Sequence, residues 1–355
     1  MGPSIDRDVR RETEAALVRA EGAAARSDRR ALLKRATLAG LALSAVGGLG
    51  RAGETDAASV SQPAMSPNMS VAVGPVQPFV RYDPTLQPVV PGPKNLTVSM
   101  MNATREIAQG VAMAGWTFNG TIPGPVLRAV VGDPITVTVQ NEATTAHSLD
   151  LHAAQTPPDK NYAIVMPGKS FQWQFTPAYP GAFMYHCGTA PTLFHIASGL
   201  YGTIIVDPPG GWPPAQELVL IESEFYVEPG PGDVSVPDFG NLMAYGPPNY
   251  VTFNGHASQY VDQPIQVKAG QPIRLFVVND GPNVWCSFHV VGAIFDRVYV
   301  NANPKNVLYG LQSISIGPGD GACVEFTLQE AGKYTAVNHS FGHAAHGASA
   351  TIQAI

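Results

Sequence analysis

The stretch VVGDPITVTVQN, residues 130–141, alternates apolar and polar residues between a Gly-Asp-Pro turn and an asparagine. A period of two residues with turn formers at both ends is typical of a β-strand that buries one face. FQWQF at 171–175 has the same period, and similar short runs continue beyond residue 90. We therefore predict an all-β chain built from β-sandwiches.

The opening stretch returns later in the chain as VKAGQPIRLFVVN, residues 267–279. PGKSFQWQF at 167–175 is similarly matched by PGDGACVEF at 318–326, and PGAFMYHC at 180–187 by AGKYTAVNH at 331–339. Three matched blocks in the same order indicate an internal duplication, with each copy the size of one Greek-key sandwich of about 130 residues. Where the first copy has His186 and Cys187, the second ends in Asn338 and His339, and nothing there replaces the cysteine.

The duplication gives a prediction of domain boundaries. We place two tandem Greek-key β-sandwich domains at residues 91–208 and 215–355, joined at the Pro/Gly-rich linker DPPGGWPP, 207–214.

The N-terminus has the pattern of an export signal. DRRALLK at 28–34 carries two adjacent arginines and is followed by the apolar run ATLAGLALSAVGGLG. This is the pattern of a Tat-type signal, and the alternative is a short N-terminal helix of the mature fold. We predict an extension and signal at 1–58, cleavage near Ala57 or Ala58, and a flexible lead-in at 59–90. The mature protein would be periplasmic or extracellular, without a membrane span.

The charge of the predicted mature chain narrows the class of partner. Beyond residue 58 there are 11 basic and 19 acidic residues, a net charge of −8. Nucleic acid is excluded as a favourable partner because its phosphates would be repelled. A small molecule or a basic or neutral redox protein fits better. An exported chain could pair Cys286 with Cys323, which would leave Cys187 single.

Metal-type side chains gather in two segments, HSLDLH at 147–152 and YHCGTAPTLFH at 185–195. Successive side chains on a strand point to opposite faces. Alternation therefore groups His147 with Cys187, to which the following loop returns His195. It also groups His152 with His186 and with Asp150, which lies two residues before His152. Two sites would then lie back to back, joined by the peptide bond between residues 186 and 187.

The two donor sets predict different metal chemistry. Two imidazoles with one thiolate are the ligands of blue copper, whereas an imidazole site beside a carboxylate suits a catalytic metal that binds a small ligand. Structural zinc is the alternative, but it favours four Cys/His ligands and only one cysteine is close in sequence. His256 in FNGH is interpreted as a structural histidine.

At these residues the chain resembles the copper-containing nitrite reductases, two-domain cupredoxin proteins that work as homotrimers. The resemblance covers roughly residues 92–352 and rests on HSLDLHAA, YHC with HIASG, GPNVWCSFHVVG with FDRVYV, and VNHS. The short CGTAPTLFH loop is similar to the subgroup with fewer residues between cysteine and histidine.

The resemblance implies a role for each matched position. Type 1 copper would be bound by His147, Cys187 and His195. Type 2 copper would be bound by His152 and His186, together with His339 from the adjacent subunit.

The implied reaction is the one-electron reduction of nitrite to nitric oxide and water. Asp150 would be the active-site carboxylate and His289 the active-site histidine, both able to carry protons. Electrons from a small redox protein, a cupredoxin or a c-type cytochrome, would enter at type 1 copper and pass to type 2 copper, giving two copper ions per chain.

The chain departs from the family at Leu200, where a methionine five residues after the type 1 histidine is usual. Losing a thioether ligand destabilises Cu(II) and should raise the potential. A laccase-like multicopper oxidase is therefore a rival, although its trinuclear cluster needs His-x-His pairs and none occurs among the nine histidines. The other rival is an electron-carrying or copper-binding cupredoxin without turnover.

Overall fold

A computed structural model describes residues 71–355 of the protein. The predicted extension and signal at 1–58, and residues 59–70 of the predicted lead-in, lie outside the described residues. None of the helices in the described part is long and apolar enough to cross a membrane.

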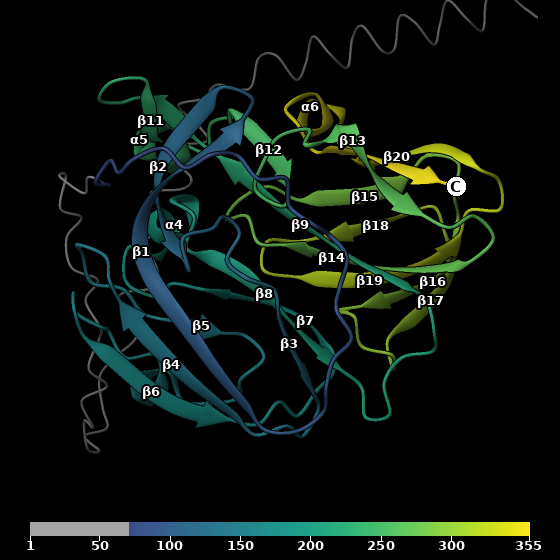
Figure 1. The fold of residues 1–355 in the computed structure, drawn as a ribbon, viewed down its shortest axis with the longest axis horizontal. Helices are drawn as coiled ribbons and strands as arrows, with labels where there is room; N and C mark the ends of the chain where they lie inside the picture. The colour runs from purple at the N-terminus through teal and green to yellow at the C-terminus, as the bar shows by residue number, and fades with distance from the viewer. Residues whose placement is uncertain (1–70) are drawn as a thin grey trace, which may run out of the picture. The chain divides into compact units, whose positions relative to one another are not determined.

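Strands dominate the described chain, as the alternating sequence predicts (Figure 1). The elements of the first half are β1 (Lys94–Ala108), β2 (Val111–Phe118), β3 (Leu127–Val130), β4 (Ile135–Asn141), β5 (Asp150–Leu151), α3 (Pro158–Asn161), β6 (Ser170–Phe175), β7 (Gly181–His186), α4 (Thr192–Ala197) and β8 (Tyr201–Asp207). Those of the second half are β9 (Gln216–Phe225), β10 (Val227–Pro229), β11 (Val234–Pro237), α5 (Phe239–Met243), β12 (Tyr250–Phe253), β13 (Tyr260–Val267), β14 (Pro272–Asn279), β15 (Cys286–Val290), β16 (Phe295–Val300), β17 (Val307–Leu311), β18 (Ser313–Ile316), β19 (Gly321–Thr327), β20 (Gly332–Asn338), α6 (Phe341–Ala345) and β21 (Ser349–Ala354).

The two halves repeat one pattern of strand pairing. β4 lies between parallel β1 and antiparallel β6, and β14 lies between parallel β9 and antiparallel β19. In the facing sheets, β7 pairs with β5 and β8, while β20 pairs with β15 and β21. The prediction of two tandem β-sandwiches is confirmed. The boundaries at 91–208 and 215–355 stay a prediction.

The alternation in the opening stretch explains how each sandwich forms. Ile135, Val137 and Val139 of β4 are buried, while the threonines between them are partly exposed. Each such aliphatic side chain contributes about 1.5–3 kcal/mol of hydrophobic stabilisation. They face the sheet of β3, β8, β7 and β5 across the core of the first half.

β7 differs from β4 because it is buried on both faces. Tyr185 packs in the core of the first half, whereas Ala182 and Met184 pack against β9 and β14 of the second half. The sheet that contains β7 is therefore covered by apolar side chains from both halves.

Residues 71–90, expected to be part of a flexible lead-in, lie against both halves of the chain. Gly74 N–H donates to Thr104 Oγ1 at 3.1 Å in the first half. Tyr82 N–H donates to Gln259 Oε1 at 2.9 Å, and Leu86 N–H to Glu217 O at 3.0 Å, in the second. The backbone groups of this described part therefore find partners on β1, on β9 and in the loop before β13.

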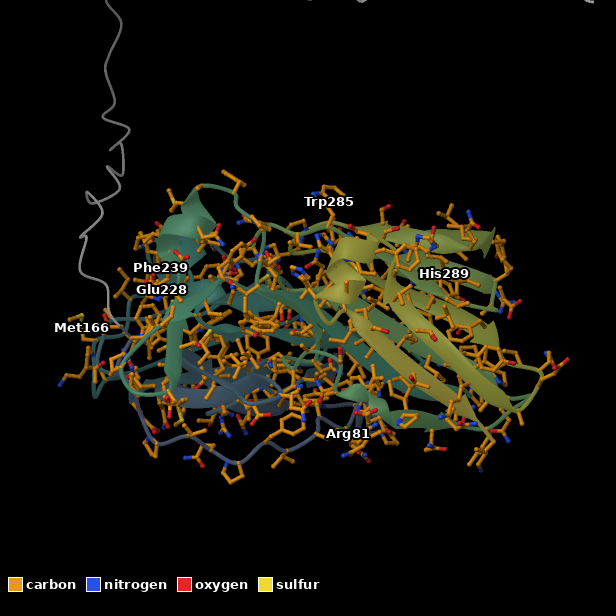
Figure 2. The ribbon with its side chains drawn as sticks, turned by 90° about the horizontal axis from the view of Figure 1, so that it is seen from above. Arg81, Met166, Glu228, Phe239, Trp285 and His289 are labelled. Atoms are coloured by element: carbon orange, nitrogen blue, oxygen red, sulfur yellow. The ribbon has the colours of Figure 1, made fainter. Side chains whose placement is uncertain are left out.

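A short excursion from the second half crosses to the first. β11 pairs in parallel with β2, so β10 and β11 extend the sheet of β1. In Figure 1, β11 and α5 lie beside β2. Phe239 of α5 stacks on Phe194 of α4, with ring centroids 4.2 Å apart. Figure 2 shows Phe239 and Glu228 on this side, well away from His289.

Buried carboxyl groups of β9 make stability depend on pH. Glu224 Oε1 accepts hydrogen bonds from the N–H groups of Asn283 at 2.7 Å and Val284 at 3.1 Å. Burial raises the pKa of Glu224 to about 8, from an ordinary 4.5. Because the folded-state pKa is the higher one, stabilisation by the neutral carboxyl is complete below about pH 4.5 and is lost as the pH rises through 8.

We expect Glu224→Gln to flatten this dependence, because the amide keeps the acceptor oxygen and cannot ionise. The free energy of unfolding, measured in urea at about pH 6 and about pH 9, should fall less in the variant than in the wild type. Glu228→Gln, at an exposed position, is the control and should keep the wild-type slope. A wild-type slope in Glu224→Gln would contradict the assignment.

Candidate metal centres

Three buried side chains point their donor atoms at one another in the first half. His147 Nδ1 and His195 Nδ1 lie 3.0 Å apart. Cys187 Sγ lies 3.3 Å from His195 Nδ1 and 3.8 Å from His147 Nδ1. The three residues are at most 2% exposed. Two imidazoles and a thiol of this kind form an N₂S donor set.

The local backbone explains why these residues meet. Cys187 directly follows β7, and its N–H donates to Leu200 O at 3.1 Å. Leu200 N–H donates in turn to His195 O at 3.1 Å, so the loop that carries His195 closes back on the strand. His147 lies on a separate segment, which an antiparallel β-bridge to Val165 holds in place.

The surroundings of this first cluster favour a bound cation. Burial lowers the pKa of His147 to about 3, helped by the nearby His195, and burial lowers that of His195 to about 4. Both imidazoles are therefore neutral and can act as metal ligands. Burial raises the pKa of Cys187, and hydrogen bonds from Ser148 and Thr189 oppose that shift. A metal ion would stabilise the thiolate, and the donor set fits copper.

A second cluster lies on the opposite face of β7. His152 Nε2 and His186 Nε2 lie 3.1 Å apart, and Asp150 Oδ2 lies 3.9 Å from His186 Nε2. His186 Nδ1 lies 3.0 Å from Cys187 O, which assigns the ring proton to Nδ1 and leaves Nε2 as the ligand atom. His152 is exposed and Asp150 is half-buried, so this cluster is open on one side.

These are the two groups that strand alternation predicts. Asp150 pairs with His186 in the ladder between β5 and β7. In the described part of the chain, only these two sets bring three metal-type donors within 4.8 Å of one another. The neighbouring residues 186 and 187 each belong to a different set.

His289 and His339 lie together in the second half, outside both clusters. Their ring centroids are 5.5 Å apart. His289 Nδ1 lies 2.5 Å from Gln312 O, which leaves its Nε2 free. Neither histidine joins Asp150, His152 and His186 within the described part of one chain. Figure 2 shows His289 on the side formed by the second half.

Three other positions singled out from the sequence have clear environments. Leu200 is fully buried in the same core cluster as Cys187. His256 lies 3.3 Å from Glu106 Oε1 and contacts the ring of Phe79, as a structural histidine does. Cys286 and Cys323 are buried and unpaired, so the disulfide considered from the sequence does not form.

Several side chains that surround the first cluster were not predicted from the sequence. The ring centroid of Trp116 lies 4.7 Å from the ring centroid of His195 and 5.1 Å from that of His147. Ser148 N–H lies 3.4 Å from Cys187 Sγ, and the Ser148 hydroxyl accepts from Gly188 N–H at 3.1 Å. The position of Ser148 directly after the ligand candidate His147 is the sequence feature that could have predicted its contact with Cys187.

The fold and the first cluster together define a copper oxidoreductase of the cupredoxin class. A multicopper oxidase family model matches residues 99–211. The chain is 35% identical to the copper-containing nitrite reductase of Neisseria gonorrhoeae over 263 residues. The matched region covers 72% of this chain and 67% of that protein.

Solved structures agree with the sequence comparison. The copper nitrite reductase of Nitrosomonas europaea is 36% identical, with a TM-score of 0.69 over 74% of this chain and 93% of that one. The copper-containing nitrite reductase of Thermus scotoductus SA-01 is 34% identical, with a TM-score of 0.67, and the match covers 74% of this chain and 62% of that one. The chain belongs to the copper-containing nitrite reductase family.

Proposed function

We propose that this protein reduces nitrite to nitric oxide and water, using two copper ions per chain in a homotrimer. One observation carries the proposal: the adjacent residues His186, at the end of β7, and Cys187, directly after it, reach two different candidate metal sites. Membership of the nitrite reductase family supports the choice of substrate.

The ligand sets follow from the two clusters. His147, Cys187 and His195 would hold type 1 copper, with Leu200 at the axial position. His152 and His186 would hold type 2 copper, with His339 supplied by a neighbouring copy. Because His289 lies beside His339, the same neighbour would supply both histidines.

When bound, copper would supply a one-electron carrier at the first cluster and a Lewis acid and electron donor at the second. The chain links the clusters by the shortest covalent route, the peptide bond between His186 and Cys187. The contact of His186 Nδ1 with Cys187 O, 3.0 Å long, strengthens this link. Electrons would therefore enter at the first cluster and leave at the second.

Asp150 and His289 would handle the two protons that the reaction consumes. Asp150 of β5 belongs to the same cluster as His152, which directly follows β5, and its half-buried carboxylate can accept a proton and donate it to nitrite. Nδ1 of His289 is committed to Gln312 O, so its Nε2 can hold a proton on the side away from that carbonyl.

The donor and the location belong to the same proposal. An acidic body after residue 58 suits a neutral or basic redox protein, either a cupredoxin or a c-type cytochrome. The twin-arginine segment implies Tat export to the periplasm or the extracellular space.

The experiment that tests the function measures nitric oxide release anaerobically, beside oxygen uptake, with an artificial electron donor. Nitric oxide formation with about two coppers per chain is the expected result. Oxygen uptake with about four coppers would identify an oxidase instead, which the multicopper oxidase match makes the relevant rival. One copper without turnover would identify an electron carrier.

We expect Leu200→Met to lower the reduction potential of the first site, because a thioether stabilises Cu(II) more than a saturated side chain does. Redox titration of the blue absorption band measures the shift. Ile204→Met adds a methionine to the same buried core and is the control. An unchanged potential in Leu200→Met alone would show that residue 200 is not axial.

A further inference from the structure

The second half contains the backbone frame of the first cluster without its metal donors. Cys187 N–H donates to Leu200 O at 3.1 Å, and Asn338 N–H donates to Ala348 O at 3.1 Å. Leu200 N–H donates to His195 O at 3.1 Å, and Ala348 N–H to His343 O at 3.1 Å. Asn338, His343 and Ala348 therefore occupy the places of Cys187, His195 and Leu200.

The side-chain contacts repeat in the same way. Ser148 N–H points at Cys187 Sγ at 3.4 Å, and Ser287 N–H donates to Asn338 Oδ1 at 3.2 Å. The atoms Cys187 Sγ and His195 Nδ1 are 3.3 Å apart, and Asn338 Nδ2 and His343 Nδ1 are 3.2 Å apart. This agreement corrects the sequence match: Asn338, and not His339, stands where the first half has its cysteine.

Hydrogen bonds from Asn338 replace the cross-links that a metal would make. Its Nδ2 donates to Glu222 Oε1 of β9 at 2.9 Å and to Trp285 O at 3.0 Å. Its Oδ1 accepts from Ser340 N–H at 3.1 Å, just before α6. The amide nitrogen of Asn338 has no lone pair to offer a metal. Asn338 instead links β9, the residue before β15 and the loop that leads to α6 through direct hydrogen bonds.

His339 depends on this network for its position. It follows Asn338 at the end of β20, is exposed, and contacts only the rings of His289 and Phe341 among the aromatic groups of the described chain. No hydrogen bond to its ring forms within residues 71–355, and its backbone N–H donates to Ser287 O at 2.7 Å. The backbone on either side of His339, which Asn338 fixes, therefore sets where the ring lies.

We propose that Asn338, with Glu222 and His343, is a converted metal site that positions His339 as a ligand for the copper of a neighbouring copy. The inference rests on the proposed function, in which His339 completes the second site. Asn338 is a positioning residue because it acts through its neighbour and does not reach the copper.

The test measures the affinity of the second copper in Asn338→Ala by chelator competition, with its electron paramagnetic resonance signal. We expect the affinity to fall by about 10- to 100-fold, the usual effect of losing a group that orients a ligand. The blue absorption of the first site should be unchanged. Retention of the wild-type affinity and signal would overturn the proposal.

Asn254→Ala is the matched control. Asn254 is another buried asparagine of the second half, with hydrogen bonds to Ile221 N–H at 2.8 Å and Tyr260 Oη at 2.6 Å. This variant should lose stability and keep both coppers at wild-type affinity. An equal loss of the second copper in Asn254→Ala would show that general destabilisation is the cause, against the proposal.

A second pair of variants tests the hydrogen bonds even if Asn338→Ala does not fold. Glu222→Ala removes the acceptor that lies 2.9 Å from Asn338 Nδ2 and leaves Asn338 in place, whereas Glu222→Gln keeps an acceptor oxygen there. We expect Glu222→Ala to weaken binding of the second copper and Glu222→Gln to hold it near wild-type affinity, and wild-type affinity in Glu222→Ala would overturn the proposal. Because copper binding is measured without turnover, an inactive wild type that binds two coppers would refute the proposed function alone.

Discussion

Replacing Cys187 with serine is expected to abolish the blue absorption and to reduce the copper content to about one per chain. Cys187 Sγ is the only sulfur in the first cluster, and it lies 3.3 Å and 3.8 Å from the two imidazole nitrogens. A serine hydroxyl does not ionise near neutral pH, so it gives neither a thiolate ligand nor the sulfur-to-copper charge transfer that produces the colour.

The other cysteines provide the control for this prediction. Cys323 is also buried and unpaired, in the core shared by the two halves, and it lies outside both clusters. Cys323→Ser should keep the colour and both coppers, with some loss of stability. Persistence of the blue band in Cys187→Ser would show that the first cluster is not the type 1 site.

Asp150→Asn is expected to lower the rate of nitrite reduction by about 10²- to 10⁴-fold, the usual contribution of a positioned proton donor. Asparagine has nearly the same shape as aspartate but cannot take up and release a proton at this position. The blue absorption should be unchanged, because Asp150 belongs to the cluster on the other face of β7. Steady-state rates with an artificial donor and the visible spectrum measure the two effects.

A surface carboxylate serves as the comparison for Asp150. Asp159 is exposed on α3, so Asp159→Asn removes the same charge from the chain without touching either cluster. Its rate should equal that of the wild type. A wild-type rate in Asp150→Asn would mean that another group delivers the protons.

Strand alternation was enough to predict the sandwiches and the grouping of the metal-type residues. ITVTV in β4 shows the period directly, and the opposite directions of His186 and Cys187 follow from their being neighbours at the end of β7. Such predictions succeed because the two-residue period is a local property of extended backbone.

The sequence could not predict contacts that depend on how distant segments meet. The parallel pairing of β11 with β2 brings part of the second half onto the first, and nothing in VSVP at 234–237 specifies that partner. Asn338 was matched one residue out of place because the sequence comparison set His339, a metal-type residue, opposite Cys187. Counting from Gly181 and Gly332 brings Asn338 opposite Cys187, and the shared hydrogen bonds to Leu200 O and Ala348 O agree with that match.

The double burial of β7 affects the order in which the chain can mature during synthesis. Until β9 and β14 have emerged from the ribosome, Ala182, Met184 and Ile205 face water. The first half therefore exposes an apolar surface until the second half covers it. Nascent chains that stall between the two halves are expected to be substrates for chaperones. The proposed Tat export of the finished, folded protein would avoid a second exposure of this face during translocation.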